Sequence, residues 1–589
     1  MRTPYPRTPH LPWSPGASPD DVRTGDLSGL AGREVVVTEK LDGENTTLYA
    51  DGLHARSPDS AHHPSRAWVK ALQGRVGRAI PPGRRICGEN MFARHSLGYR
   101  ELDSWFYAFS VWDGERCLDW DATVRFTRRL GIPVPKVLWR GVFDERALRG
   151  LKLATDRVEG YVVRTVAGFD RARFGSRVAK WVRPSHVTTD AHWMLAPVVP
   201  NGLGPAAVLW DVRSGAAPDA AALLAATGLT AGDLGGPAAV ERAAGAAADA
   251  AGRLDLLGRT GDARLAGVLA ALAVPARRGV VAGRLAGPRG VALGVPLARR
   301  VADLAGLCHV LRRPFPDEER RAGLVRLASA VDVGALHAVA AALPGGARER
   351  EAVQWSELWA REAGLLGPEP LEALRREVRE ALDVADAAAG DRCWAVARQA
   401  YALGRIGSGR QAAALTWRWR SGAFPRLVQL VGPAGSGKST FAAGLGAPVV
   451  SLDGLRAARG DRADQRANAA VLAEGLARLD EALARAAADG GTVVWDATSL
   501  NRRQRSVVHA VAARRDALLT HAVLVVDDAE TARRNADRAH PVPAAVLARQ
   551  LDRFAPPSPA EADRTWYVDA HATVRDTAGT LNDADGDGD

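Results

Sequence analysis

Lysine is scarce in this chain of 589 residues. Lysine and arginine together number 78, yet only six are lysines: Lys40, Lys70, Lys136, Lys152, Lys180 and Lys438. Arginine can replace lysine as a source of positive charge, but it keeps its proton and cannot act as a nucleophile as a neutral lysine amine can. Each of the six lysines is therefore a candidate for amine chemistry, and the residues around it indicate whether it is functional or present by chance.

Cysteine and long apolar runs are also scarce. The four cysteines, Cys87, Cys117, Cys308 and Cys393, lie far apart and form no CxxC pair. This spacing argues against a disulfide framework or a cysteine zinc site and favours a reducing compartment. The sequence shows neither a membrane-spanning run nor the apolar region of a signal peptide, so we expect a cytoplasmic protein without a membrane partner. Its net charge of +11 suits an anionic partner.

The chain is too long for a single hydrophobic core. Its composition and its pattern of apolar residues change along its length. Residues 1–200 read as a strand-rich mixed domain, and residues 201–420, rich in Ala, Leu and Arg, as a helical domain of unknown role. In residues 421–575 strands alternate with helices, which predicts a parallel sheet. Residues 576–589 read as a disordered acidic tail. The expected fold class is multidomain α+β and α/β.

The first candidate site is Lys40-Leu-Asp42-Gly-Glu-Asn45, at the end of a predicted strand. A lysine that attacks a nucleotide α-phosphate needs a depressed pKa, nearby charges, and a glycine that lets the backbone come close. Four further motifs follow in order, and they contain Glu89 (RRICGENMF), Phe109 (WFYAFSVWDG), Glu159 (EGYVVR) and Lys180 (VAKWVR).

This ordered set resembles the covalent nucleotidyltransferases, specifically the ATP-dependent RNA ligases. The resemblance implies that ATP adenylylates Lys40, with Glu39, Asp42 and Asn45 beside the nucleotide. Arg56 would contact a phosphate or the sealed end, Glu89 the ribose, Phe109 the adenine and Lys180 the α-phosphate, while Glu159 would bind the metal. A second lysine is often expected two residues after Lys180; here Val182 stands there, and Arg183 is the candidate replacement.

The second candidate site is Gly432-Pro-Ala-Gly435-Ser-Gly437-Lys438-Ser439, between the apolar strand RLVQLV and a predicted helix. A GxxxxGKS sequence in this context indicates a P-loop, in which backbone N–H groups face phosphates. Lys438 would reach the β- and γ-phosphates, and Ser439 would ligate magnesium. The predicted nucleotide-binding set is Gly432, Gly435, Gly437, Lys438, Ser439 and Thr440.

Asp453 and Arg456 follow the next strand as a DxxR motif, where a carboxylate can deprotonate an acceptor hydroxyl and an arginine can hold its phosphate. With the P-loop and the later VVWDATSLNRRQR, the motif resembles the 5′-OH polynucleotide kinases. The resemblance implies that Asp453 is the general base, that Arg456 holds the acceptor and that Asp496 supports the metal. Arg534 and Arg538, four residues apart on one predicted helix, would belong to a lid over the donor phosphates.

A kinase and a ligase in one chain predict an enzyme that heals and seals broken RNA, with ATP and Mg²⁺ or Mn²⁺ as cofactors. The expected partner is RNA with broken ends, of which transfer RNA is one candidate. No 3′-end phosphatase motif is evident, so a separate phosphatase is expected. Two alternatives remain open. One is a DNA ligase or guanylyltransferase fused to a small-molecule kinase; the other is a catalytically decayed, nucleotide-sensing RNA-binding protein.

Overall fold

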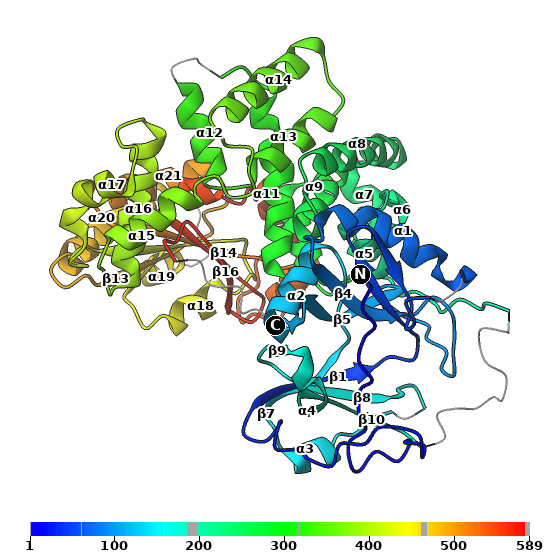
Figure 1. The fold of residues 1–589 in the computed structure, drawn as a ribbon. Coiled ribbons are helices and arrows are strands. Elements are labelled where there is room, and N and C mark those ends of the chain that lie inside the picture. Colours follow the sequence, from blue (N-terminus) through cyan, green and yellow to red (C-terminus); the bar gives the residue numbers. More distant parts are fainter. Residues whose placement is uncertain are drawn as a thin grey trace. The chain divides into compact units, whose positions relative to one another are not determined.

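The computed structural model describes residues 2–59, 62–154, 156–184, 197–315, 319–460 and 468–582 (Figure 1). The chain forms two compact units: residues 1–226 with 258–265, and residues 227–257 with 266–589. The expected multidomain α+β and α/β organisation is confirmed. The break between the units does not fall at the proposed boundaries, because most of the helical middle region lies in the same unit as the C-terminal sheet.

The first unit contains an antiparallel four-stranded sheet in the order β10 (Val178–Val182), β8 (Gly160–Thr165), β1 (Glu34–Lys40) and β7 (Val137–Val142). One face of this sheet packs in an apolar cluster that includes Val35, Val37, Tyr161 and Val163. Because side chains alternate along a strand, Lys40 at the end of β1 lies on the other face.

The second sheet of this unit has six strands in the order β3 (Gly52–His54), β2 (Glu44–Tyr49), β4 (Arg84–Asn90), β5 (Phe106–Asp113), β6 (Arg116–Cys117) and β9 (Phe169–Asp170). Apolar residues of α1 (Ala67–Val76) and α2 (Trp120–Arg129) pack on it around Leu48 and Ile86. The remaining short helices are η1 (Pro64–Arg66), η2 (Gly77–Ala79), α3 (Glu145–Arg149), η3 (Arg171–Arg173), α4 (Phe174–Arg177), α5 (Ala207–Arg213) and α6 (Ala220–Thr227).

The middle region is helical, as predicted. Its helices in the described residues are α7 (Ala231–Leu234), α8 (Pro237–Leu256), α9 (Gly261–Ala273), α10 (Arg278–Ala286), α11 (Val295–Leu311), α12 (Arg320–Ala328), α13 (Val333–Ala342), α14 (Ala347–Glu362), α15 (Glu372–Ala381), α16 (Ala387–Ala402), α17 (Gly409–Leu415) and η6 (Trp417–Trp419). Within the described ranges no single helix is long and apolar enough to cross a membrane, although α12 and α13 pass that test as a pair bent by 106°.

The C-terminal sheet has the order β12 (Val449–Ser451), β13 (Thr492–Asp496), β11 (Arg426–Val431), β14 (Leu518–Leu524), β15 (Arg564–Val568) and β16 (Val574–Ala578). The first five strands are parallel, as predicted, and β16 is antiparallel to β15. Its helices are α18 (Lys438–Gly444), α19 (Leu452–Ala458), α20 (Asn468–Ala486), α21 (Arg502–Arg514), α22 (Asp528–Ala536), α23 (Ala544–Arg553) and η7 (Pro559–Glu561).

The prediction that an acidic tail starts at residue 576 is wrong. Residues 576–578 belong to β16, where Asp576 pairs with Tyr567, and Leu581 is buried. The composition of this segment is polar, but pairing with β15 and the burial of Leu581 fix it in the fold. Residues 583–589 of the proposed tail lie outside the described residues.

Candidate active sites

Lys40 meets a buried carboxylate at the end of β1. Its Nζ donates a hydrogen bond of 2.5 Å to Oε2 of Glu159, which precedes β8. The pairing of β1 with β8 sets this contact, because it aligns Lys40 with Gly160. The structure therefore brings together the predicted nucleophile and the predicted metal ligand, which are 119 residues apart in the sequence.

The expected depression of the Lys40 pKa is contradicted. Burial by itself favours the neutral amine, but Glu159, Glu89 and Asp42 outweigh burial, and the pKa of Lys40 is raised above its ordinary value. The amine is thus protonated at neutral pH. Chemistry at phosphorus requires that this proton leave.

Lys180 lies on the same sheet face as Lys40. It is opposite Val162 in β8, which is opposite Thr38 in β1, and residues two apart in a strand share a face. Burial, and then the charge of Lys40, lower the pKa of Lys180; Arg56 acts in the same direction. The charges of Lys40, Lys180 and Arg56 therefore influence one another. Such a set of cationic groups suits the binding of a phosphate.

Asp42 and Gly43 form the turn after Lys40. The Asp42 N–H donates to the Tyr99 hydroxyl oxygen (3.1 Å), and the Leu97 N–H donates to the Asp42 carboxylate (2.7 Å). A Cβ atom at Gly43 would lie 2.6 Å from the carbonyl oxygen of Asn90. Packing within the protein therefore requires glycine here, and the close approach of this backbone to a nucleotide stays a prediction.

Asn45 and Glu89 stand opposite each other in the pairing of β2 with β4. Among the described residues, Oδ1 of Asn45 is buried without a hydrogen-bond partner. Burial raises the pKa of Glu89 to about 8. The amide oxygen of Asn45 can accept a hydrogen bond, and the carboxyl group of Glu89 beside it can donate one when it is protonated. The two groups together suit the hydroxyl groups of a ribose.

The remaining predicted residues of this site have other contacts in the structure. The ring of Phe109 packs edge-on against Tyr5, with centroids 5.1 Å apart. Strand alternation puts Glu39 on the face opposite Lys40, and burial raises the pKa of Glu39. The Arg183 N–H donates to the carbonyl of Glu159 (3.0 Å). Contacts of Phe109, Glu39 and Arg183 with a nucleotide stay predictions.

The P-loop connects β11 to α18, as predicted. Gly432, Gly435 and Gly437 have φ angles of 158°, 82° and 98°, which side-chain-bearing residues rarely adopt. Lys438 Nζ donates to the carbonyl of Pro433 (2.6 Å), so the lysine folds back over its own loop. Burial lowers the pKa of Lys438 to about 8.

Ser439 and Asp496 form the candidate metal site of the second unit. The Ser439 hydroxyl donates to Oδ2 of Asp496 (3.1 Å), and Ser451 lies 3.5 Å from the same oxygen. These oxygen donors fit Mg²⁺ or Mn²⁺, which would neutralise phosphate charge there. Within the described residues, no three His, Cys, Asp or Glu side chains gather as a metal-binding group.

Asp453 in the first turn of α19, directly after β12, forms an ion pair with Arg456 in the last turn of the same helix. Both line an open groove of about 1340 Å³. The groove also contains the predicted residues Gly435, Gly437, Lys438, Ser439, Thr440, Asp496, Arg534 and Arg538. Tertiary structure thus gathers the predicted phosphate-binding, acceptor and lid residues around one space.

The prediction that Arg534 and Arg538 share a helix is wrong. Helix α22 ends at Ala536, so Arg538 lies beyond it. The side chain of Asn535 binds both the N–H (3.1 Å) and the carbonyl (2.7 Å) of Val542 and turns the chain back. Both arginines still line the groove, with Arg534 bonded to Glu530 (2.6 Å).

Several groove residues were missed by sequence reasoning. Gln550 of α23 accepts a hydrogen bond from the Ala434 N–H of the P-loop (2.9 Å), and Asn501, Arg503 and His540 also line the groove. Asn501 and Arg503 lie within the quoted VVWDATSLNRRQR, so proximity to Asp496 was an available signal. No sequence pattern marks Gln550, which acts across 116 residues.

Comparison with protein families agrees with the two sites. Residues 33–182 match the family model for RNA ligases, and residues 427–557 match a family model described as an AAA domain. No curated protein matches the chain.

Solved structures show limited similarity. The RNA ligase of Naegleria gruberi, determined as a mutant with ATP and Mn, is 15% identical with a TM-score of 0.21, over 27% of this chain and 52% of that one. An archaeal ATP-dependent RNA ligase is 14% identical with a TM-score of 0.22, over 31% and 48%. A gluconokinase from Sinorhizobium meliloti is 23% identical with a TM-score of 0.19, over 25% and 83%. This chain spans about half the length of the two RNA ligases.

The family matches cover the sequence motifs from Lys40 to Lys180 and from the P-loop to Arg538. The chain therefore contains an RNA ligase domain at residues 33–182 and a P-loop domain of the AAA type at residues 427–557.

Proposed function

We propose that this protein repairs broken RNA in two steps, phosphorylating a 5′-OH end and then sealing it to a 3′-OH end. The observation that carries the proposal is the convergence of Lys438, Ser439, Asp453, Arg456 and Asp496 on one groove, in a chain that also has an RNA ligase domain. The kinase product is the substrate that the ligase domain requires.

In the kinase step, Asp453 accepts the proton of the 5′-hydroxyl as its oxygen attacks the γ-phosphorus of ATP. Arg456 holds the phosphate of the acceptor, and Lys438 binds the β- and γ-phosphates. A divalent cation between Ser439 and Asp496 would offset the developing charge. ADP leaves with the bridging oxygen. The groove volume of about 1340 Å³ supports a polynucleotide end rather than a small metabolite, because small-molecule sites usually span about 300–1,000 Å³.

In the sealing step, neutral Lys40 attacks the α-phosphorus of ATP, forming an N–P bond as pyrophosphate leaves. Asn45 and Glu89 hold the ribose, and Lys180 with Arg56 binds the α-phosphate. AMP then passes to the RNA 5′-phosphate, and the 3′-OH displaces it. Glu159 accepts a hydrogen bond from Lys40 in the structure, and a cation held by Glu159 would favour the neutral amine.

The test is a nicked RNA stem-loop with 5′-OH and 3′-OH ends, incubated with ATP and magnesium and resolved on a denaturing gel. We expect a sealed product, and unsealed 5′-phosphorylated RNA from Lys40→Arg. Sealing of DNA nicks alone, or covalent labelling by GTP rather than ATP, would replace the proposal with the DNA ligase or the guanylyltransferase. Absence of nucleotide transfer, with nucleotide binding retained, would favour the decayed sensor.

We further propose that the physiological substrate is a broken RNA such as transfer RNA and that a separate enzyme prepares the 3′ end. Sealing requires a free 3′-OH, whereas many RNA cleavages leave a 2′,3′-cyclic phosphate. RNA halves with a cyclic-phosphate end should be joined only after a 3′-end phosphatase is added. Joining without it would reveal a further activity in this chain.

A further inference from the structure

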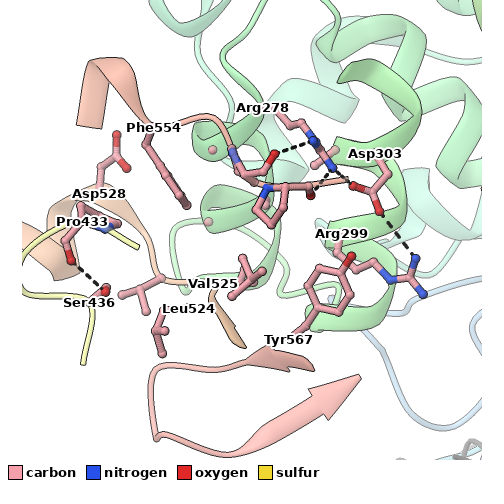
Figure 2. A pocket seen from close by; sticks show the side chains of 18 residues that line it. Arg278, Arg299, Asp303, Pro433, Ser436, Leu524, Val525, Asp528, Phe554 and Tyr567 are labelled. Atoms are coloured by element: carbon pink, nitrogen blue, oxygen red, sulfur yellow. Dashed lines mark hydrogen bonds and ion pairs between the residues drawn. The ribbon is translucent and has the colours of Figure 1, made fainter. Parts of the chain in front are cut away.

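Two helices of the middle region pack behind the P-loop. In Figure 2, α10 and α11 face Pro433, Ser436 and the end of β14 across a small cavity. The cavity has a volume of about 20 Å³, which is room for one water molecule. The carbonyl of Pro433 on this wall accepts the hydrogen bond of Lys438, so the helices support the loop that holds the phosphate-binding lysine.

Ion pairs and hydrogen bonds fix the two helices to the C-terminal segment. Arg278 of α10 donates to the carbonyls of Pro556 (2.7 Å) and Pro557 (3.0 Å), and it also pairs with Asp303 of α11 (Figure 2). Arg299 of α11 binds Asp576 of β16 at 2.6 Å. Such a network of buried, hydrogen-bonded charges defines one packing geometry.

Glycines bring α10 into backbone contact with the segment that precedes α22. A Cβ atom at Gly283 would lie 2.7 Å from the carbonyl oxygen of Val526, and one at Gly279 would lie 2.9 Å from the ring of Phe554. Any larger residue at Gly283 must push the two segments apart, because the nearest atom belongs to the backbone.

Arginines of this helix and its following loop converge on the start of α22. Asp527 caps α22 by accepting from the Ala529 N–H (2.9 Å), and it is 5% exposed. The same carboxylate pairs with Arg284 (3.8 Å) and Arg289 (3.6 Å). Arg284 and Arg289 therefore act on the N-cap residue of the helix that carries Arg534 into the groove.

We propose that α10 positions the nucleotide-gripping parts of the kinase, with Gly283, Arg284 and Arg289 as positioning residues. Through Val526 and Asp527 they set the position of α22, and hence of Arg534, relative to the P-loop. The proposal rests on the proposed kinase function and gives residues 278–303 a role in phosphoryl transfer, although none of them lines the groove. Since lid contacts act mainly in the transition state, misplacement should lower kcat more than it raises KM.

The first test compares two glycine-to-alanine changes in the full chain. Gly283→Ala should lower the kcat for phosphorylation of 5′-OH RNA on the order of tenfold to a hundredfold, with a smaller change in the KM for ATP. Gly245→Ala in α8, where a Cβ meets nothing within 4 Å, is the matched control and should leave kcat unchanged. Unchanged kcat in Gly283→Ala would overturn the proposal.

The second test compares two buried arginines of the middle region. Arg284 is 10% exposed and pairs with Asp527 (3.8 Å) and with Asp233 (3.2 Å), whereas Arg312 is 9% exposed and pairs with Glu349. Arg284→Gln should lower kcat and speed amide hydrogen exchange in α22, Arg284→Lys should restore part of both, and Arg312→Gln should change neither.

Two further readouts separate this proposal from its alternatives. Adenylylation of Lys40 in the same variants should stay at the wild-type rate; its loss together with kinase activity would show a structural role and overturn the proposal. If the wild-type chain does not phosphorylate RNA, the proposed kinase function fails. In that case the amide hydrogen exchange of α22 is measured with and without MgATP. An exchange rate that Arg284→Gln leaves unaltered would overturn the positioning role as well.

Discussion

Lys40 is held by the carboxylate that is also expected to bind metal. Burial by itself favours the neutral amine, but Glu159, Glu89 and Asp42 together outweigh it and stabilise the charged form. The reactivity of Lys40 therefore depends on how bound substrates change the electrostatic field of the neighbouring carboxylates.

Replacing Lys40 by arginine should abolish the covalent AMP adduct, because a guanidinium does not lose its proton to attack phosphorus. The measurement is incorporation of label from α-labelled ATP. Lys70→Arg, on the exposed side of α1, is the control and should label like the wild type. Undiminished labelling of Lys40→Arg would place the nucleophile elsewhere.

Adenylylation should accelerate with pH. The reactive amine is the deprotonated form, and a raised pKa keeps its fraction small throughout the neutral range. The initial rate should therefore climb by up to about tenfold per pH unit from about pH 6 to about pH 9. A rate that levels off below neutral pH would show that the bound cation and nucleotide lower the pKa of Lys40 below its value in the free protein.

The KM of the kinase for ATP should rise at alkaline pH, because Lys438 loses its charge there. Its pKa is lowered to about 8, so the free protein loses this charge as the pH rises past that value, while bound phosphates favour the charged form. The KM for ATP should be flat below about pH 7 and rise by up to about tenfold per pH unit above about pH 8. Lys438→Arg, whose charge does not titrate there, should turn over slowly without this rise.

At the scale of elements, a buried ion pair joins the Lys40 turn to a helix. Glu44 begins β2, two residues after Asp42, and accepts from Arg66 Nε (2.8 Å) at the end of η1. Their side chains are 8% and 5% exposed. The pair therefore fixes β2, and the turn before it, against the helical layer that begins with α1.

Arg66→Ala should lower the free energy of unfolding of the first unit by about 3–5 kcal/mol, because it leaves the Glu44 charge buried without its partner. Denaturant unfolding measures the change. Adding Glu44→Met to Arg66→Met should recover much of the loss, since an apolar pair requires no charge compensation. A double variant as unstable as Arg66→Ala would show that packing, rather than the unpaired charge, determines the effect.

At the scale of the whole molecule, the two sites lie in different compact units and should be separable. Asp453→Asn should stop phosphorylation of 5′-OH RNA, because the amide cannot accept the hydroxyl proton, and should still seal RNA that already carries a 5′-phosphate. Gel assays on the two substrates distinguish the steps. Asp489→Asn, at an exposed turn after α20, is the control. Loss of sealing in folded Asp453→Asn would show that the sites are coupled.

The sequence by itself determined what depends on a few neighbouring residues. The P-loop could be predicted because its glycines, Lys438 and Ser439 are contiguous. The strand that carries Lys40 could be predicted because a run of β-branched valines is a local signal. The DxxR motif likewise needed only the end of β12 and the short helix α19 that follows it.

Only the tertiary structure decided what depends on residues far apart in the sequence. The pKa of Lys40 follows from Glu159 and Glu89, the end of α22 from the bond of Asn535 to Val542, and the order of residues 576–578 from pairing with β15. The contact of α10 with Asp527 joins residues whose sequence patterns show only helix. Burial and electrostatic fields arise from the packed arrangement, so a linear pattern can name the reacting groups but not the charges that surround them.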